Sequence, residues 1–338
     1  MNSGQTSSPA HVTHVDLGDT SLNQRIGEGV AAVEQLLRDE LSVGENFISE
    51  KVLHLCEAGG KRFRPMMALL ASEFGKEPGS NSVIQAATSV EMVHLATLYH
   101  DDVMDEADRR RGVESANKRW DNSVAILAGD ILLAHCSRLM SRLDTHTVEH
   151  FAETFRELVT GQMRETLGAG EANPVEHYTK VIEEKTAVLI ASAGYLGAYH
   201  SGAAPEHAEA LRRIGSHIGM MFQIVDDIID IFSDKDESGK TPGTDLREGV
   251  FTLPVLYALE EDTPVGEELR GLLTGALTDD ASVDRAIDLL RQSNGRQRAL
   301  EDIRSYLAAV DAELDKLPDI AAAKALRSLS HYTIERVG

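Results

Sequence analysis

Apolar residues recur at three- and four-residue spacing through most of the chain. The segments IGEGVAAVEQLLRDEL, AVLIASAGYLGAYH and ASVDRAIDLLRQS show this spacing, which is typical of helices with a buried face. The alternating patterns expected of strands are scarce. The sequence therefore predicts an all-α protein, a large helical bundle whose helices are separated by short segments rich in glycine and proline.

Length and composition favour one large domain. The chain has 338 residues, of which 42% are apolar, enough to bury a sizeable core. No internal stretch resembles a linker, so we predict one domain over residues 21–338. Residues 1–20 lack the basic and apolar regions of a signal peptide and are predicted to form a disordered tail. No run of 18 or more apolar residues occurs, so no transmembrane segment is expected.

Charge and cysteine usage exclude several classes of protein. The net charge is -22, with 55 acidic against 33 basic residues, and nucleic-acid binding requires a basic surface. Cys56 and Cys136 lie far apart and form no CxxC motif, so neither a disulfide framework nor a zinc site is predicted. Both are expected to be core residues in a reducing cytoplasm.

Two similar acidic segments stand out, HDDVMD at 100–105 and VDDIID at 225–230. On a helix, Asp101 and Asp105 lie one turn apart on one face, and Asp102 lies about 100° around the axis. Mg²⁺ prefers carboxylate oxygens and usually keeps waters or phosphate oxygens as its other ligands. A single such cluster is most often a solvated acidic helix face. Two clusters within apolar helices favour Mg²⁺ sites that hold a diphosphate.

Basic residues accompany the clusters. Arg110 and Arg111 closely follow the first cluster, and guanidinium groups match phosphate oxygens well. The segment GGKRFRP at 59–65 combines close backbone approach at its glycines with three cations before a helix. Alone it could equally be a loop with solvated charges. Together the acidic and basic segments predict metal ions bound by the acids and phosphates bound by the arginines.

Five motifs in this order, GGKRFRP, HLATLYHDDVMDEADRRRG, EKTAVL, FQIVDDIIDIF and GKTPGTDLREG, resemble those of the trans-prenyl diphosphate synthases, specifically the long-chain members. The resemblance runs from about Leu22 to the C-terminus. It implies the isoprenoid synthase type of all-α fold, in which both aspartate motifs face a central cavity, and a cytoplasmic homodimer. It also implies the reaction, in which an allylic diphosphate loses pyrophosphate and alkylates isopentenyl diphosphate.

The resemblance assigns roles to individual residues. Three Mg²⁺ ions per active site would be bound by Asp101, Asp102, Asp105, Asp226, Asp227 and Asp230. The allylic diphosphate would also be held by Arg110, Lys185 and Lys240. Isopentenyl diphosphate would be held by Gly60, Lys61, Arg62, His94 and Arg111. From the residues alone, His94 is more often a satisfied core histidine.

Thr186 and Gln223 match family positions whose oxygens lie near the carbocation. Many members carry a lysine after the DLREG segment, where this chain has Val250. Either one cation of the diphosphate site is missing, or Arg247 replaces it.

Product length in this family depends on the residues that precede the first cluster. Val93, Ala96 and Thr97 occupy these positions, and no aromatic ring blocks the first turn of the tunnel, which argues against a C15 product. Leu132, Leu133 and His135 are the candidates for the deeper floor of the tunnel, and the sequence does not decide among them. The favoured product is an all-trans chain of about C35 to C50, for a quinone side chain, made from farnesyl or geranylgeranyl diphosphate and passed to a membrane enzyme. Geranylgeranyl diphosphate (C20) stays the alternative.

Three other functions compete with this hypothesis. A terpene cyclase shares the fold, but its second metal motif differs from VDDIID and it has no use for GGKRFRP. A non-catalytic subunit of a heteromeric prenyl synthase usually has degraded aspartate motifs, whereas both are intact here. A structural helical bundle would require the basic segments to be accidental.

Overall fold

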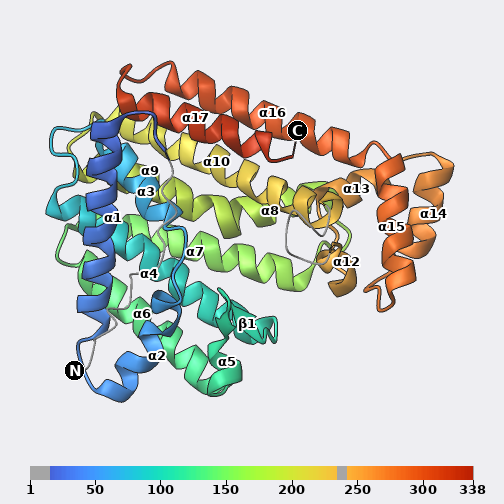
Figure 1. The fold of residues 1–338 in the computed structure, drawn as a ribbon, viewed down its shortest axis with the longest axis horizontal. Helices are drawn as coiled ribbons and strands as arrows, with labels where there is room; N and C mark the ends of the chain where they lie inside the picture. Colours follow the sequence, from blue (N-terminus) through green and yellow to red (C-terminus); the bar gives the residue numbers. More distant parts are fainter. Residues whose placement is uncertain (1–15, 234–241, 338) are drawn as a thin grey trace, which may run out of the picture. The chain divides into compact units, whose positions relative to one another are not determined.

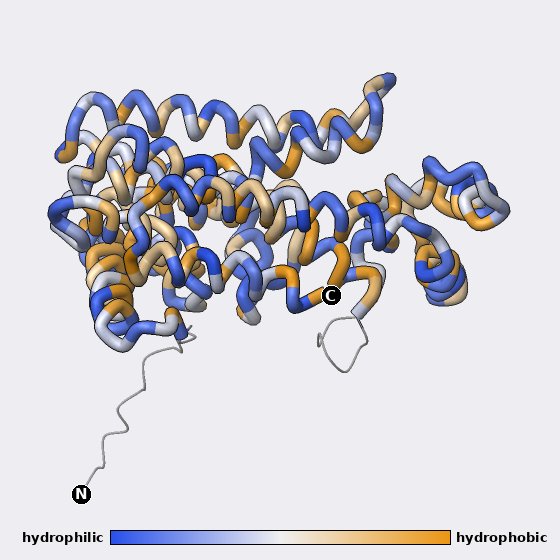
Figure 2. Tube along the Cα trace, turned by 90° about the horizontal axis from the view of Figure 1, so that it is seen from above, coloured by the Kyte–Doolittle hydropathy of each residue, from blue (hydrophilic) through white to orange (hydrophobic). Residues whose placement is uncertain are grey.

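The computed structural model describes residues 16–233 and 242–337 (Figure 1). Helices form nearly all of the regular structure in this part of the chain, and one two-stranded hairpin is its only sheet. The prediction of an all-α protein is therefore confirmed. Hydrophilic and hydrophobic segments alternate along the helices, as expected when each helix buries one face (Figure 2). The predicted boundaries of the tail and the domain stay predictions.

Unit 1, the first of two compact units, comprises Met1–Ala152 and Ala193–Ala208. Its helices are α1 (Thr20–Leu41), α2 (Asn46–Glu57), α3 (Phe63–Ser72), α4 (Asn81–Met104), α5 (Ala116–Arg119), α6 (Asn122–Met140) and the start of α7 (Thr145–Leu167). Helices α1, α3 and α6 all pack against α4. Residues 86–93 of α4 are buried without a break, so α4 is the core helix of this unit. Cys56 and Cys136 are buried and free, as predicted.

Side-chain caps fix where the main helices of unit 1 begin. Asp19, Ser80 and Asp121 stand before α1, α4 and α6, and each accepts a hydrogen bond from the backbone N–H three residues later. Such caps satisfy donors that the first helical turn leaves unpaired. With its start fixed, α4 runs to Met104, and the first aspartate cluster therefore falls at its C-terminal end.

A short hairpin follows α4. Its strands are β1 (Arg109–Arg110) and β2 (Val113–Glu114), paired antiparallel with Arg110 opposite Val113. The two turn residues, Arg111 and Gly112, have φ angles of 52° and 81°. Two consecutive positive φ values are characteristic of the tight turn that suits the twist of a two-residue hairpin. The turn thereby presents three consecutive arginines in a defined geometry.

Helix α6 is the one helix in the described ranges that is long and apolar enough to cross a membrane, with a mean hydropathy of 1.4. It packs against α4, α2 and α5 within unit 1 and contains Asp130 and Arg138. Core helices of globular proteins often have this composition. The helix is therefore weak evidence for a membrane span.

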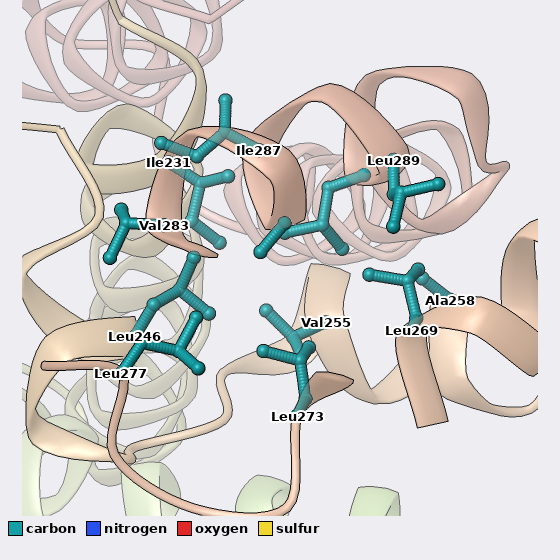
Figure 3. Close-up of a cluster of buried hydrophobic side chains, with 12 residues drawn as sticks. Ile231, Leu246, Val255, Ala258, Leu269, Leu273, Leu277, Val283, Ile287 and Leu289 are labelled. Atoms are coloured by element: carbon teal, nitrogen blue, oxygen red, sulfur yellow. The ribbon is translucent and has the colours of Figure 1, made fainter. Parts of the chain in front are cut away.

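Unit 2 comprises Glu153–Ser192 and Glu209–Gly338. It contains the end of α7, α8 (Pro174–Ile182), η1 (Glu183–Ala187), the start of α9 (Val188–His200), most of α10 (Pro205–Phe232), α12 (Thr244–Glu248), α13 (Leu253–Leu259), α14 (Pro264–Leu272), α15 (Asp280–Gln292), α16 (Gly295–Leu314) and α17 (Ala321–Glu335). Helices α16 and α17 lie side by side (Figure 1). Figure 3 shows the apolar cluster that joins α10 to α12–α15 and includes Ile231, Leu246 and Ile287. This cluster anchors the segment that follows the second aspartate motif.

Candidate active site

The first aspartate cluster occupies the last turn of α4. Asp101 is half-buried, Asp102 is buried, and Asp105 is exposed at the C-cap position. The C-terminal end of a helix carries a partial negative charge, so three carboxylates there repel both the helix end and one another. The cluster therefore requires cations, from the protein or from bound metal.

Asp102 is oriented toward the protein and not toward solvent. Arg110 of the hairpin donates from its Nε to Asp102 Oδ1 at 2.6 Å. Burial raises the pKa of Asp102, and the hydrogen bond from Arg110 opposes that shift. The other carboxylate oxygen is buried with no hydrogen-bond partner among the described residues. The middle aspartate thus fixes the hairpin, whereas Asp101 and Asp105 keep accessible surface.

Arg111, at the turn of the hairpin, is held by the segment after α2. Its Nη1 donates to the carbonyl oxygen of Leu55 at 3.1 Å and to that of Gly59. A Cβ on Gly60 would lie 3.0 Å from the guanidinium carbon of Arg111. Gly60 also has a φ of 153°, in the region that favours glycine. The glycines of GGKRFRP therefore serve the close approach of an arginine.

Arg62 does not face solvent, contrary to its predicted role as a substrate ligand. Its guanidinium donates to Glu91 at 3.0 Å, to Glu34 at 3.2 Å and to the carbonyl oxygen of Cys56 at 2.9 Å. The side chains of Arg62 and Glu91 are only 1% and 2% exposed. Arg62 has a φ of 48°, and this left-handed conformation directs it inward. Each of its three nitrogens donates a hydrogen bond, so we interpret Arg62 as a structural ion-pair partner.

Arg64, two residues later, differs from Arg62 in having a nitrogen without a partner. It was not among the predicted ligands. Its Nε is buried without a hydrogen-bond partner in the described ranges. Burial, together with the neighbouring charge of Arg111, lowers the pKa of Arg64 to about 10. An unsatisfied buried guanidinium is costly unless an anion completes it. The motif GGKRFRP contained this signal, but the sequence could not distinguish its two arginines.

His94 of α4 belongs to the same group. Burial and the positive charges of Arg64 and Arg111 lower its pKa well below the usual value. The imidazole is therefore neutral near pH 7 and can donate one hydrogen bond without adding charge. Lys61 is exposed. Unit 1 thus groups His94 with two arginines around the single buried carboxylate of Glu91.

The second aspartate cluster lies on α10. Asp227 is buried, and both its oxygens accept hydrogen bonds: Tyr178 donates its hydroxyl to Oδ2, and Gln223 donates its amide to Oδ1 at 2.9 Å. Burial raises the pKa of Asp227 to about 7, with further contributions from the neighbouring aspartates, while the two hydrogen bonds oppose the shift. As in the first cluster, the middle aspartate is directed toward protein donors.

The outer aspartates of this cluster keep accessible surface. The Asp226 side chain is 44% exposed, and Arg336 approaches its Oδ1 at 3.5 Å. Asp230 is half-buried, and its Oδ2 accepts from the backbone N–H of Asp245 at 3.2 Å. Asp226 and Asp230 are spaced one turn apart, so their carboxylates share one helix face.

Lys185 and Thr186 lie in η1, a single π-helical turn between α8 and α9. Lys185 forms an ion pair with Glu165 of α7, and Thr186 donates to Gln223 Oε1 at 3.4 Å. A π-turn widens the helix locally, and such turns are frequent at functional sites. Thr186 and Gln223, which the resemblance assigned to positions near the carbocation, are therefore in contact.

The segment after the second cluster is only partly described. Lys240 lies outside the described residues. Arg247 forms an ion pair with Asp280 at 2.7 Å, and Val250 is exposed. Whether Arg247 replaces the missing lysine stays a prediction.

The predicted chain-length residues differ in burial. Thr97 is half-buried, on the same face of α4 as His94 and Asp101, whereas Val93 and Ala96 are completely buried. Of the three, Thr97 therefore has the accessible surface. Among the candidates for the deeper floor, Leu132 is buried, and Leu133 and His135 are half-buried.

The donor groups fit Mg²⁺ that is shared with a substrate. No three His, Cys, Asp or Glu side chains in the described part of the chain are grouped to hold a metal by themselves. Each cluster offers two accessible outer carboxylates one turn apart, and Mg²⁺ commonly takes one or two carboxylates and completes its shell with waters and substrate phosphates. The two middle aspartates, which the sequence assigned as ligands, accept hydrogen bonds from protein donors, Asp102 through one oxygen and Asp227 through both.

Comparison with known proteins identifies one family. A family model described as polyprenyl synthetase matches residues 45–290. A nonaprenyl diphosphate synthase from Mycobacterium tuberculosis is 52% identical over 97% of this chain and 98% of its own length.

Two solved structures are similar in fold. One is a geranylgeranyl pyrophosphate synthase from Corynebacterium glutamicum, complexed with calcium and isoprenyl diphosphate. It is 64% identical with a TM-score of 0.90, and the match covers 96% of this chain and 100% of that one. The other is a decaprenyl diphosphate synthase from Rhodobacter capsulatus, 33% identical with a TM-score of 0.84 over 94% of this chain and 99% of that one.

Proposed function

The chain belongs to the polyprenyl synthetase family and is a prenyltransferase, and we propose that it joins isopentenyl diphosphate to an allylic diphosphate in successive 1'-4 condensations. The observation that carries this proposal is the group formed by Arg64, Arg111 and His94. In a chain of net charge -22, two half-buried arginines beside a neutral imidazole are a site for an anion with several oxygens.

We assign isopentenyl diphosphate to this group. Arg64 and Arg111 bind its phosphate oxygens, His94 donates one hydrogen bond, and exposed Lys61 adds a mobile charge. Gly60 contributes by allowing Arg111 to approach the backbone. Arg64 takes the role that the sequence gave to Arg62, because the donors of Arg62 are already satisfied.

The allylic diphosphate is assigned to the aspartate clusters. The outer carboxylates, from Asp101, Asp105, Asp226 and Asp230, would hold three Mg²⁺ ions, which would supply positive charge to this substrate. Arg110, Lys185 and Lys240 are assigned to the oxygens of the same diphosphate. Arg110 is paired with Asp102 of the first cluster, and Lys185 is paired with Glu165 of α7. Calcium and isoprenyl diphosphate in the related C. glutamicum enzyme support a divalent metal at such a site.

The chemistry follows from this arrangement. The bond between C1 and oxygen of the allylic diphosphate breaks, and its electron pair leaves with pyrophosphate. Bound Mg²⁺ supplies positive charge that stabilises this leaving group. The double-bond electrons of isopentenyl diphosphate form the new bond to C1, and the proton then lost from C2 goes to a pyrophosphate oxygen. No side-chain base is needed.

Thr186 and Gln223 stabilise the positive carbon. The amide of Gln223 is oriented at both ends, because its nitrogen donates to Asp227 and its oxygen accepts from Thr186. The oxygens of both residues are neutral dipoles, which stabilise positive charge without forming a covalent adduct.

We propose a long all-trans product of about C35 to C50. The 52% identity with a nonaprenyl diphosphate synthase and the absence of an aromatic ring at Ala96 and Thr97 support it. The 64% identity with a geranylgeranyl pyrophosphate synthase favours the C20 alternative.

The test is to incubate the purified protein with Mg²⁺, isopentenyl diphosphate and farnesyl diphosphate, and to measure product length by mass spectrometry. Products of about C35 or longer support the proposal. A dominant C20 product keeps the reaction and rejects the long-chain assignment. Absence of any product from the protein alone favours a subunit of a heteromeric synthase.

The protein is also proposed to be a cytoplasmic homodimer whose apolar product passes to a membrane enzyme. Neighbouring Ile126 and Leu127 on α6 are 43% and 59% exposed, and exposed apolar neighbours mark interfaces. Light scattering should give a molar mass twice that of one chain. Leu127→Glu should lower this mass to that of a single chain. A monomeric parent protein would contradict the proposal.

A further inference from the structure

Tyr178 is a buried residue of α8 that no motif includes. Its hydroxyl donates to Oδ2 of Asp227, and both residues are less than 10% exposed. Gln223 occupies the other carboxylate oxygen. The two oxygens of Asp227 are therefore fixed by donors from two different helices, α8 and α10.

The Tyr178 hydrogen bond constrains more than one carboxylate. Tyr178 lies two helical turns before Lys185, and the chain continues from α8 directly into the π-turn that contains Lys185 and Thr186. The bond to Asp227 ties this continuous segment to α10, where Thr186 contacts Gln223. Four side chains thus form one connected network, in the order Thr186, Gln223, Asp227 and Tyr178.

A tyrosine buried in a helix is most often a packing residue with a satisfied hydroxyl. Two observations argue for more. A carboxylate buried beside two other carboxylates is unfavourable without donors, and here the donors are uncharged. The first cluster also repeats the arrangement, since Arg110 binds its middle aspartate, Asp102. In both clusters the middle carboxylate is held by the protein while the outer two stay accessible.

We propose that Tyr178 is a positioning residue of the allylic diphosphate site. It orients Asp227 and, through it, keeps Asp226 and Asp230 directed toward the metal-bridged diphosphate and Gln223 directed toward Thr186. Asp227 acts in this role as an anchor and not as a metal ligand. This inference rests on the proposed function.

The test compares two tyrosines that each donate to an aspartate. Tyr178→Phe removes only the hydroxyl bonded to Asp227. The matched control is Tyr257→Phe, because Tyr257 donates to Asp302 at 2.5 Å between α13 and α16 of the same unit, outside the aspartate clusters. Both variants lose one hydrogen bond between a tyrosine and a carboxylate. Any difference between their effects is therefore due to where the bond lies and not to the number of bonds lost.

The first measurement is binding of methylenediphosphonate, an inert pyrophosphate analogue, by calorimetry over a range of Mg²⁺ concentrations. Tyr178→Phe should weaken Mg²⁺-dependent binding by about tenfold, the effect of losing one hydrogen bond to a charged group. Tyr257→Phe should bind as the parent does. In steady-state assays, kcat of Tyr178→Phe should fall while the KM for isopentenyl diphosphate is unchanged.

A double-mutant cycle tests the anchor role. If Tyr178 acts through Asp227, then Asp227→Asn should weaken binding much less in the Tyr178→Phe background than in the parent. Additive effects of the two substitutions would overturn the inference. Circular dichroism of each variant shows whether it is folded. If Tyr178→Phe is misfolded, Tyr178→Trp serves as a second variant without the hydroxyl.

The outcomes separate the inference from the proposed function. A parent protein that binds the analogue and converts substrate, with Tyr178→Phe indistinguishable from it, overturns the inference alone. Equal losses in Tyr178→Phe and Tyr257→Phe also overturn it. A parent protein that neither binds the analogue with Mg²⁺ nor forms product overturns the proposed function and the inference together.

Discussion

Arg62 and Arg64 stand two residues apart in one basic motif, and replacing each by methionine should have opposite effects. Arg62→Met removes the main partner of buried Glu91. Breaking a buried ion pair costs about 3–5 kcal/mol, and we expect the lower end because Arg111 remains 3.8 Å from Glu91. With an unfolding entropy of about 2 cal/mol/K per residue, a loss of about 3 kcal/mol lowers the Tm by roughly 4 °C.

Arg64→Met removes no hydrogen bond from Nε, since that atom has no partner in the described residues. A buried guanidinium nitrogen without a partner is unfavourable, so its removal should not lower the free energy of unfolding. The KM for isopentenyl diphosphate should rise about 10- to 150-fold, corresponding to the loss of one charge-assisted hydrogen bond of about 1.5–3 kcal/mol.

Thermal unfolding followed by circular dichroism gives the first quantity, and initial rates at saturating farnesyl diphosphate give the second. The control is Arg156→Met, which removes an exposed arginine paired only with Glu153 and should change neither quantity. If Arg62→Met leaves the Tm unchanged but raises the KM, or if Arg64→Met lowers the Tm by several degrees, the assignment of the two arginines is wrong.

Other substitutions have equally specific expectations. Thr97→Phe, on the accessible face of α4, should shorten the product measured by mass spectrometry, and an unchanged product length would place the tunnel elsewhere. Ala96→Phe must instead fit a ring into a fully buried position. It should lower the free energy of unfolding by about 1–3 kcal/mol. Burial raises the pKa of Glu40, but hydrogen bonds from Arg142 and Arg138 outweigh it and lower the pKa below the usual 4.5. The ionised form thus stabilises the fold above about pH 4.5, and this stabilisation is lost as the pH falls through the lowered pKa. In urea denaturation, Glu40→Gln should be less stable than the parent by about 1–2 kcal/mol at pH 7, with the difference shrinking below pH 4; a pH-independent difference would contradict this.

The sequence predicted the helical fold and the positions of both clusters because their signals are local. Apolar spacing near 3.6 residues requires no knowledge of the partner helix. Aspartates such as Asp101 and Asp226 are conspicuous because a charge within an apolar helix is unfavourable unless it is paired or bound to a metal. The family resemblance assigned Thr186 and Gln223 to positions near the carbocation, but it did not predict the hydrogen bond between them.

What the sequence could not provide was side-chain direction. In GGKRFRP all three cations look equivalent, and only the left-handed backbone at Arg62 decides that this side chain turns inward to Glu91 while Arg64 does not. The same holds for Asp102 and Asp227, which share a motif with the proposed metal ligands but are directed toward Arg110 and Tyr178. A lone tyrosine in an amphipathic helix gives no sign of its hydroxyl partner.

The π-turn Glu183–Ala187 makes this part of the chain sensitive to length. A π-turn accommodates one residue more than a regular helical turn. Deleting a residue of this turn that precedes Thr186 would let the backbone close as an ordinary α-helix and change the position of Thr186 on the helix surface relative to Tyr178. Thr186 and Tyr178 should then no longer both reach their partners on α10. In a library of single-residue insertions and deletions, survivors should accordingly be depleted between Tyr178 and Ala187, even where conservative point substitutions are tolerated.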